Sequence, residues 1–307
     1  MLSNKINVCL ACDDNYSKYA GVVIASILAN ANHDDALAIY VLDGGISETK
    51  KEEILSLKSI KDCEINFVDI DESMFTEYSK IKTLEHISFV TYYRLKLSTI
   101  LPNISRIIYF DCDMVVLTSL KELYQMDIGE KYIAGCVDIG SKRTFAKSKD
   151  YINAGLLLFD LDKIREHNVE KSFLEYAISN IDNLKYADQD IINYASKDGI
   201  YILDDKWNVQ SSNFVNRSSY TNKPKVVHFI APKKPWHWAS FSYHRDLYFK
   251  YLQLTPWKLS DEDYKHWTKD NQVASLLAYL KYRPTFFLRP RFYRAIKATY
   301  FTEEGEI

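Results

Sequence analysis

Two aspartates, Asp111 and Asp113, come directly after the apolar residues 106–110. On an extended chain, carboxylates at positions i and i+2 point to the same side and can share one divalent cation. Mn²⁺ and Mg²⁺ prefer such oxygen ligands, and a cation held there can bridge a diphosphate and neutralise the charge that develops as it leaves. Many strands end in an Asp-x-Asp pair for solubility alone, so this motif needs support from other residues.

Three other polar groups in the chain supply that support. The acidic turn at residues 13–16 also follows an apolar stretch and offers acceptors for a base and a ribose. His228 is a candidate third metal ligand through a neutral imidazole nitrogen, although a single histidine in an apolar strand is more often a core residue. Lys233 and Lys234 come a few residues later and can supply cations for phosphate oxygens. Together these residues predict a metal–diphosphate site.

The elements that must position these residues alternate between strand and helix over the first 125 residues. Apolar stretches predict strands at 6–11, 37–42, 65–70 and 106–110, and helices are expected at 19–30, from 47 onward and at 87–101. This alternation indicates a parallel βαβ-type sheet, in which ligands bind beyond the carboxyl ends of strands, where the acidic turns fall. Beyond residue 130 the pattern is mixed, with short apolar runs at 132–137, 154–161 and 226–230.

Composition limits the classes of protein to which the chain can belong. Its 307 residues are 47% hydrophobic and 26% charged, which is typical of one large or two small globular domains. The net charge of −2 argues against a nucleic-acid partner held by a basic field. Five cysteines, with one C-x-x-C pair at Cys9 and Cys12, are interpreted as structural thiols in a reducing compartment. We expect neither a signal peptide nor a membrane span.

The C-terminal residues differ in character from the rest. Residues 271–302 carry six basic residues, eight aromatic residues and no Asp or Glu, whereas residues 1–270 carry 33 basic and 38 acidic residues. A basic, aromatic segment on an acidic body predicts attachment to an anionic membrane surface. The alternative interpretation is a solvated helix packed on the body by its aromatic residues. Pro284 and Pro290 predict two short helical pieces in either case.

Several motifs, in this order along residues 6–238, resemble those of the family 8 retaining glycosyltransferases. The similarity is greatest to the bacterial lipo-oligosaccharide and lipopolysaccharide α-galactosyltransferases of that family. The matching pieces are Ala11-Cys12-Asp13-Asp14-Asn15-Tyr16, Val41-Leu42-Asp43-Gly44-Gly45-Ile46-Ser47, His86-Ile87-Ser88, Thr91-Tyr92-Tyr93-Arg94-Leu95, Tyr109-Phe110-Asp111-Cys112-Asp113, Asn153-Ala154-Gly155, Asp188-Gln189-Asp190, and His228 with Pro232, Lys234, Pro235 and Trp236.

The resemblance implies an α/β fold of the GT-A type, in which a Rossmann-like mixed sheet is flanked by helices. It predicts a catalytic domain over residues 1–260, followed by the basic aromatic helical tail over 261–307. The implied cofactor is Mn²⁺ or Mg²⁺, and the implied donor substrate is a UDP-sugar.

The resemblance also implies a role for each matching residue. The metal ligands would be Asp111, Asp113 and His228, and the acceptor-side residues His86 and Tyr186. The residues at the reacting carbon, called catalytic here, would be Gln189 and Asp188. Contacts to the UDP-sugar would come from Ala11, Asp13, Asn15, Tyr16, Arg94, Asp111, Cys112, Asn153, Ala154, Ala231 and Lys234. Physically, a carboxylate and a guanidinium can fix sugar hydroxyls by charge-assisted hydrogen bonds.

Two departures from the family pattern affect specificity. Ala231 stands where relatives usually have glycine, and its methyl group could crowd the diphosphate or narrow the donor pocket. The polar loop at residues 138–152 looks shorter than in the galactosyltransferases. The acceptor specificity of those enzymes therefore does not carry over to this chain.

The implied activity is metal-dependent, retaining transfer of a hexose from UDP-galactose or UDP-glucose to a hydroxyl of a bacterial surface glycan or glycolipid such as lipopolysaccharide. We expect the protein in the cytoplasm, peripheral on the inner face of the cytoplasmic membrane. Because Gln189 is a neutral amide and a poor nucleophile, front-face transfer is favoured over double displacement, with Asp188 as the alternative nucleophile. The sequence leaves open galactose or glucose, the acceptor, the linkage and the oligomeric state.

Three other activities remain as alternatives. A sugar-1-phosphate nucleotidyltransferase would use similar metal chemistry, but it usually has a Gly-rich basic loop where this chain has the acidic residues 13–16. A non-catalytic carbohydrate-binding protein on the same fold would not need intact Asp111, Asp113 and His228. A glycogenin-like self-glucosylating protein is disfavoured by the basic tail.

Overall fold

A computed structural model describes residues 5–78, 89–138, 150–211, 223–230, 234–237, 240, 242 and 244–264. Three features predicted from sequence lie wholly or largely outside these residues: the acceptor-side His86, Ala231, and the basic tail. Most of the polar loop 138–152 also lies outside them.

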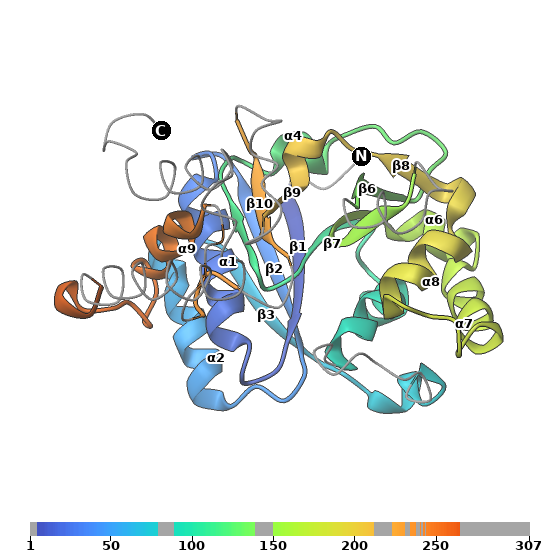
Figure 1. Ribbon diagram of the computed structural model, residues 1–307, viewed down its shortest axis with the longest axis horizontal. Coiled ribbons are helices and arrows are strands. Elements are labelled where there is room, and N and C mark those ends of the chain that lie inside the picture. The colour runs from blue at the N-terminus through green and yellow to red at the C-terminus, as the bar shows by residue number, and fades with distance from the viewer. Residues whose placement is uncertain are drawn as a thin grey trace, which may run out of the picture.

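The main sheet is mixed, as the family resemblance implies (Figure 1). Among the described residues its strand order is β3-β2-β1-β4-β7-β6-β8. Strands β1 to β4 pair in parallel, whereas β7 runs antiparallel to both β4 and β6. The strands are β1 (Lys5–Cys12), β2 (Ala36–Asp43), β3 (Glu64–Asp69), β4 (Arg106–Phe110), β6 (Ile133–Val137), β7 (Ile152–Asp160) and β8 (Ile200–Ile202).

Alternate residues of the central strands supply two separate halves of the core. In β1, Val8 and Leu10 pack with helices α1 and α2, while Cys9 and Ala11 face the opposite side with η4, α6, α7 and α8. In β4, Ile108 faces the same side as Val8 and Leu10, and Tyr109 faces the opposite side. Since side chains alternate across a strand, these strands are apolar on both faces. This is why they read in the sequence as continuous hydrophobic runs.

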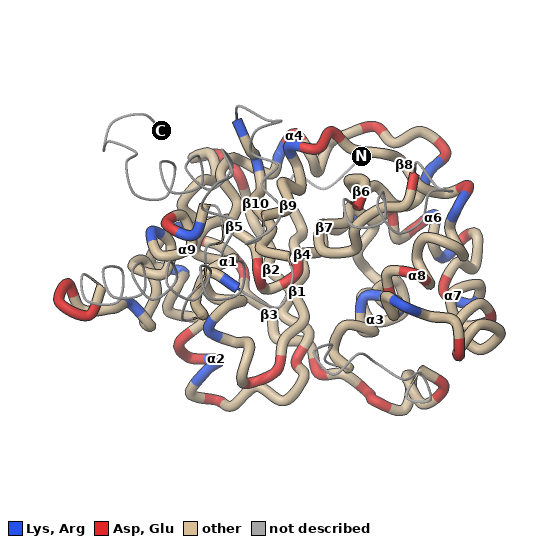
Figure 2. Tube along the Cα trace, viewed as in Figure 1, with Lys and Arg blue, Asp and Glu red and all other residues tan. Residues whose placement is uncertain are grey.

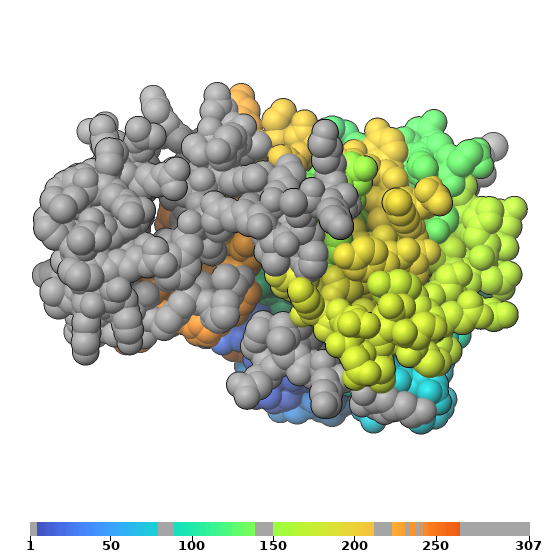
Figure 3. Space-filling view, turned by 45° about the vertical axis from the view of Figure 1, so that its right-hand side comes forward, coloured from blue at the N-terminus to red at the C-terminus, as the bar shows by residue number. Residues whose placement is uncertain are grey.

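Helices cover both faces of this sheet, with α1 and α2 on one side and α6, α7 and α8 on the other (Figure 1). In the space-filling view, α7 and α8 form the outer surface at one end of the described molecule (Figure 3). The α-helices are α1 (Ser17–Asn30), α2 (Glu48–Leu55), α3 (Leu97–Ile100), α4 (Lys121–Tyr124), α6 (Leu161–Glu166), α7 (Val169–Ser179), α8 (Ala187–Ala195) and α9 (Arg245–Leu252). The 3-10 helices are η1 (Ser56–Ser59), η2 (Glu72–Phe75), η4 (Phe89–Lys96), η5 (Lys197–Gly199) and η6 (Asp205–Asn208).

The helix expected at 87–101 is wrong in type over most of its described length. Residues 89–96 form the 3-10 helix η4, and only residues 97–100 are α-helical. Four consecutive side chains of η4, from Tyr92 to Leu95, are buried. Aromatic and β-branched residues here are weak α-helix formers, and burial on all sides replaces the amphipathic stripe of a surface helix. The consequence for the site is that Arg94 points into the protein.

A second sheet, which the sequence does not predict, carries His228. It consists of β5 (Met114–Val116), β10 (Val226–Phe229) and β9 (Val209–Ser211), with β10 in the middle. Strand β10 pairs antiparallel with β5, in a register that sets His228 opposite Met114, and it pairs parallel with β9. The strand that follows the Asp-x-Asp motif therefore lies beside the strand that contains the histidine.

The last described residues pack onto the first half of the chain. Helix α9 lies against α1. The indole of Trp257 donates a 2.9 Å hydrogen bond to Glu53 and packs over Gly21, where a larger residue would meet the ring. No helix among the described residues is long and apolar enough to span a membrane. Lys and Arg are interspersed with Asp and Glu along the described chain (Figure 2).

Candidate active site

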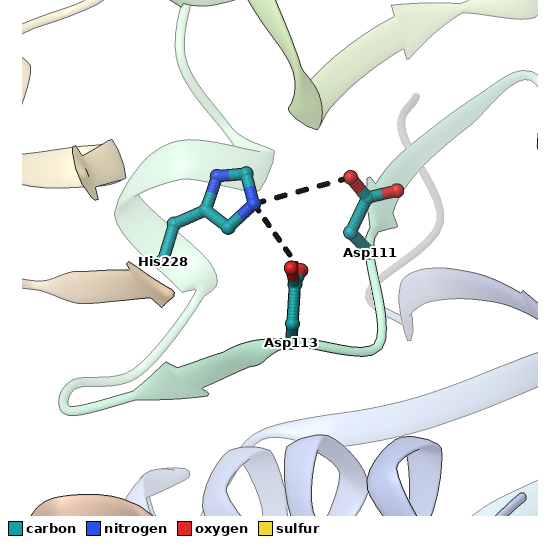
Figure 4. A group of neighbouring side chains, drawn as sticks. All are labelled: Asp111, Asp113 and His228. Carbon is teal, nitrogen blue, oxygen red and sulfur yellow. Dashed lines mark ion pairs between the residues drawn. The ribbon is translucent and has the colours of Figure 1, made fainter. Parts of the chain in front are cut away.

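The predicted metal ligands meet at the junction of the two sheets. Asp111 follows β4 of the main sheet, Asp113 precedes β5, and His228 lies in β10. The Nε2 atom of His228 is 3.2 Å from Asp113 Oδ1 and 4.0 Å from Asp111 Oδ2 (Figure 4). The chain bends at residues 112 and 113 instead of staying extended, yet one ligand atom from each of the three residues lies within 4.8 Å of the others.

A close backbone approach makes room for this cluster. Gly155 of β7 lies directly beneath it, and its carbonyl accepts a 2.7 Å hydrogen bond from the Asp111 amide. A Cβ atom at this position would lie 2.9 Å from Asp111 Oδ2 and would meet His228 Cε1 and the Met114 methyl group. Two carboxylates and an imidazole whose ligand atoms lie within 4.8 Å of one another form a fitting donor set for a hard divalent cation such as Mn²⁺ or Mg²⁺.

Asp113 has a cationic partner in Lys234. Lys234 donates its ammonium group to Asp113 Oδ2 and also to the Phe229 carbonyl, 2.8 Å away. Burial alone would raise the pKa of Asp113, but Lys234 and His228 together outweigh burial and hold that pKa below its usual range. Asp113 is therefore ionised at any pH at which the protein would work.

Arg94 connects this cluster to helix α8. Its guanidinium, 5% exposed, donates to Asp111 Oδ1 at 2.7 Å and to the Ala154 carbonyl at 2.6 Å. Its Nε lies 3.1 Å from Asp188 Oδ2, and its planar group lies over the Tyr109 ring. Burial opposes the charge on Arg94, but Asp111 and Asp188 outweigh it and raise the pKa of Arg94. One buried cation thus holds a carboxylate from each side of the site.

The two residues predicted at the reacting carbon begin helix α8. Ala187 adopts a left-handed conformation with φ of 48°, which is uncommon for a residue with a side chain and reorients the chain just before Asp188. Further along α8, the amide of Asn193 bonds both backbone groups of Ile152 at 2.7 and 2.8 Å and thereby fixes the helix to β7. Gln189 consequently contacts Asn153 and Ala154, whereas Asp188 contacts Thr91 and Arg94.

Asp188 has an unusual protonation equilibrium. Burial raises the pKa of Asp188 to about 6, while Arg94 opposes the rise and the Asp111 carboxylate adds to it. Its Oδ1 also accepts a hydrogen bond from the Thr91 hydroxyl at 3.1 Å. The carboxylate that pairs with Arg94 therefore becomes protonated only slightly below neutral pH.

The amide oxygen of Gln189 accepts two hydrogen bonds. The backbone N–H of Ala154 donates to it at 3.1 Å, and the Asn153 side chain donates at 3.2 Å. Both lone pairs of this oxygen are engaged. Tyr186 lies next to it at the N-terminal end of α8 and is half-buried, with its backbone N–H bonded to Asp190.

The residues predicted to contact the base and ribose lie at the carboxyl end of β1. Asp13 accepts a hydrogen bond from the Tyr16 amide at 2.9 Å, and Asn15 is exposed. The ring of Tyr16 is 39% exposed and contacts Tyr19, which stacks at 3.9 Å on Trp236.

This aromatic stack fixes the segment that carries Lys234 beside residues 13–16. The thiol of Cys112 donates to the Ala11 carbonyl at 3.3 Å and so links the Asp-x-Asp turn to β1. The five cysteines are free, and four of them are buried.

Two residues at the site were missed by sequence reasoning. Asn208, at the end of η6, contacts His228 and Asn153, and Asp138, at the end of β6, accepts from Asn153 at 3.0 Å. Neither belongs to a motif with characteristic spacing. Only the folded contacts identify them.

The sequence profile of glycosyl transferase family 8 matches residues 7–239, well over half of the chain. The chain is a family 8 glycosyltransferase. General stress protein A of Bacillus subtilis is 28% identical over 84% of this glycosyltransferase and 96% of its own length. The lipopolysaccharide 1,3-galactosyltransferase of Salmonella typhimurium is 26% identical over 78% of this chain and 75% of its own.

Solved structures agree with this assignment. The galactosyltransferase LgtC, in complex with donor and acceptor sugar analogues, superposes with a TM-score of 0.71 at 27% identity, over 85% of this glycosyltransferase and 99% of LgtC. The family resemblance and the GT-A fold expected from the sequence are therefore confirmed.

Gly155→Ala tests the metal site of this glycosyltransferase without removing a ligand. Because the added methyl group would displace Asp111 or His228, we expect Mn²⁺ binding to weaken by at least about tenfold. Electron paramagnetic resonance of free and bound Mn²⁺ measures the affinity, and a thermal melt checks that the variant is folded. A folded variant with wild-type affinity would place the metal elsewhere.

The pKa of Asp188 predicts an acid limb in the pH–rate profile. Above about pH 6 the carboxylate is ionised and pairs with Arg94, and below it protonation removes the pair. We expect kcat/KM to fall by about tenfold per pH unit well below pH 6. Asp113 does not contribute to this limb, because its pKa lies far lower. Asp188→Asn should lower activity and flatten the limb, and an unchanged limb in that variant would assign it to another group.

Proposed function

We propose that the protein transfers galactose or glucose from UDP-galactose or UDP-glucose, with retention at the anomeric carbon, to a hydroxyl of a bacterial surface glycan or glycolipid. The observation that carries the proposal is the ion-pair bridge of Arg94. It joins a metal-ligating carboxylate, Asp111, to Asp188 at the start of α8. The similarity to a lipopolysaccharide galactosyltransferase supports the substrate class.

In this proposal the nucleotide binds across the carboxyl ends of β1 and β4. Asp13, Asn15 and Tyr16 contact the uracil and ribose, since they follow β1, which pairs with β4, and Lys234 contacts the phosphates, since it lies against Asp113. Asp111, Asp113 and His228 would hold a Mn²⁺ or Mg²⁺ ion, which would supply positive charge that stabilises the departing UDP. Asn153, Asp188 and Gln189 orient the donor sugar, and Tyr186 contacts the acceptor.

Hydrogen bonding in the site favours front-face transfer. In that mechanism UDP leaves while the acceptor hydroxyl enters from the same face, and a leaving phosphate oxygen takes the acceptor proton. Double displacement needs a side chain with a free lone pair at the anomeric carbon. The Gln189 oxygen accepts two hydrogen bonds, and the buried Asp188 carboxylate is paired with Arg94. Gln189 is therefore not prepared to act as a nucleophile, and Asp188, whose Oδ2 accepts no hydrogen bond, remains the alternative nucleophile.

Replacing one metal-ligating carboxylate tests the proposal. Asp111→Ala or Asp113→Ala should lower UDP release by about 10³-fold or more, because several kcal/mol of transition-state stabilisation are lost. Asp34→Ala, which removes an exposed carboxylate paired with Lys121, is the matched control and should be near wild type. The assay screens UDP-galactose and UDP-glucose with lactose-, galactose- and glucose-terminated acceptors in Mn²⁺.

Different results would contradict this function. Near wild-type turnover in both aspartate variants would place the metal site elsewhere. Label incorporated into the protein itself would favour self-glucosylation. Pyrophosphate-dependent turnover would favour a nucleotidyltransferase, and no turnover of any donor would favour a binding protein.

We also propose that residues 271–302 attach the enzyme to the inner face of the cytoplasmic membrane, near a lipid-linked acceptor. Six basic residues contribute roughly 1 kcal/mol each at an anionic surface, and aromatic residues settle at the headgroups. The full chain should co-sediment with phosphatidylglycerol vesicles at low salt and detach at high salt. A variant with the six basic residues changed to Gln should stay in the supernatant. Wild-type protein that stays in the supernatant at low salt would contradict the proposal.

A further inference from the structure

Four buried or half-buried side chains form a continuous hydrogen-bonded chain through the site. His228 Nδ1 lies 3.1 Å from Asn208 Oδ1, and Asn208 Nδ2 donates to Asn153 Oδ1 at 2.9 Å. Asn153 Nδ2 then donates to Gln189 Oε1 at 3.2 Å. The chain runs from the metal cluster at one end to α8 at the other, and Asn208, 2% exposed, is the link that crosses between the two sheets.

Two backbone N–H groups fix the direction of every bond in this chain. The Gly155 N–H donates to Asn153 at 3.1 Å, so the contacted atom must be the oxygen of that amide. The Ala154 N–H donates to Gln189 at 3.1 Å and identifies its oxygen in the same way. Asn153 must therefore accept from Asn208, and Asn208 must present its own oxygen to His228.

This direction decides the tautomer of the imidazole. A carbonyl oxygen only accepts, so the proton of neutral His228 must be on Nδ1. Nε2 then faces Asp111 and Asp113 with its lone pair. The lone pair of Nε2 and the negatively charged carboxylates repel each other, and a cation bound between them would turn this arrangement into a favourable one. Asn208 thus prepares His228 as a ligand before any metal arrives.

We propose that Asn208 is a positioning residue that holds His228 in its metal-binding tautomer and couples the metal cluster to the amides of Asn153 and Gln189. The proposal deepens the proposed function and rests on it for the metal. The coupling has a physical basis, because Asn208 is buried and its two hydrogen bonds have no ready replacement by solvent. A shift of the imidazole would be transmitted to the residues that face the donor sugar.

Asn208→Leu tests the metal end of the hydrogen-bonded chain, because it removes both hydrogen bonds of Asn208 with little change in side-chain volume. We expect Mn²⁺ affinity without nucleotide, measured by electron paramagnetic resonance, to fall by about tenfold or more. Asn7→Leu is the matched control. Asn7 is also buried and donates to the Arg106 carbonyl and the Tyr124 hydroxyl, away from the site. This control should lower thermal stability and leave Mn²⁺ affinity unchanged.

Asn208→Asp tests the sugar end. A carboxylate still accepts from His228 but cannot donate to Asn153. Its added charge can only strengthen Mn²⁺ binding, so this variant is assayed for kcat at saturating Mn²⁺. We expect kcat to fall by about tenfold, while Asn7→Leu retains it. A kcat equal to wild type would overturn the coupling between the two ends.

The tautomer gives a readout that requires neither metal nor activity. In ¹⁵N-histidine-labelled protein, at a pH at which the His228 ring carries a single proton, that proton should be on Nδ1, with the signal assigned by its loss in His228→Gln. A proton on Nε2, or Mn²⁺ affinity weakened equally by Asn208→Leu and Asn7→Leu, would overturn the proposal. Wild-type protein that binds no Mn²⁺ would contradict the metal-dependent function instead, and the tautomer would still decide the role of Asn208.

Discussion

The buried ion pairs of Arg94 are the interaction on which the rest of the site depends. A guanidinium that is 5% exposed is stable only if charged partners replace the water it has lost. Asp111 and Asp188 are those partners, at 2.7 and 3.1 Å. They come from opposite sides of the site, so the neutralisation of one cation brings two elements to a fixed separation. Removal of any of the three groups would leave the others buried without compensation.

The 3-10 helix η4 carries this guanidinium and directs it into the protein. Tyr92 and Tyr93 are buried beside Arg94, and its side chain lies over the Tyr109 ring of β4. The Tyr109 ring and the hydrogen bonds to Asp111 and the Ala154 carbonyl restrict the arginine to one direction, and the planar guanidinium fixes hydrogen-bond geometry as an ammonium group would not. The 3-10 conformation of η4 and the position of the Arg94 charge therefore depend on each other.

The second constraint is the junction between the two sheets. The antiparallel pair β5–β10 brings His228 next to Asp113, although more than a hundred residues separate them in the chain. Gly155 allows β7 to pass close beneath the cluster because it has no side chain to displace the ligands, and Asn208 makes directed hydrogen bonds to His228 and Asn153. Lys234 pairs with Asp113 and Arg94 pairs with Asp111, so positive charge offsets the repulsion between the two neighbouring carboxylates.

The sequence alone determined the strands β1 to β4, the family and the candidate metal ligands. The apolar runs of β1, β2 and β4 were predicted correctly because these strands are buried on both faces, which leaves a continuous hydrophobic signal, whereas the edge strand β3 is only partly buried. The motifs identified the family because they occur in the family's order and contain the residue types that the family has at those positions. Only the tertiary structure decided that η4 is a 3-10 helix, that His228 lies in a second sheet, and that Asn208 and Asp138 belong to the site. These features depend on contacts between distant segments, and a contact between distant segments leaves no periodic pattern in either of them.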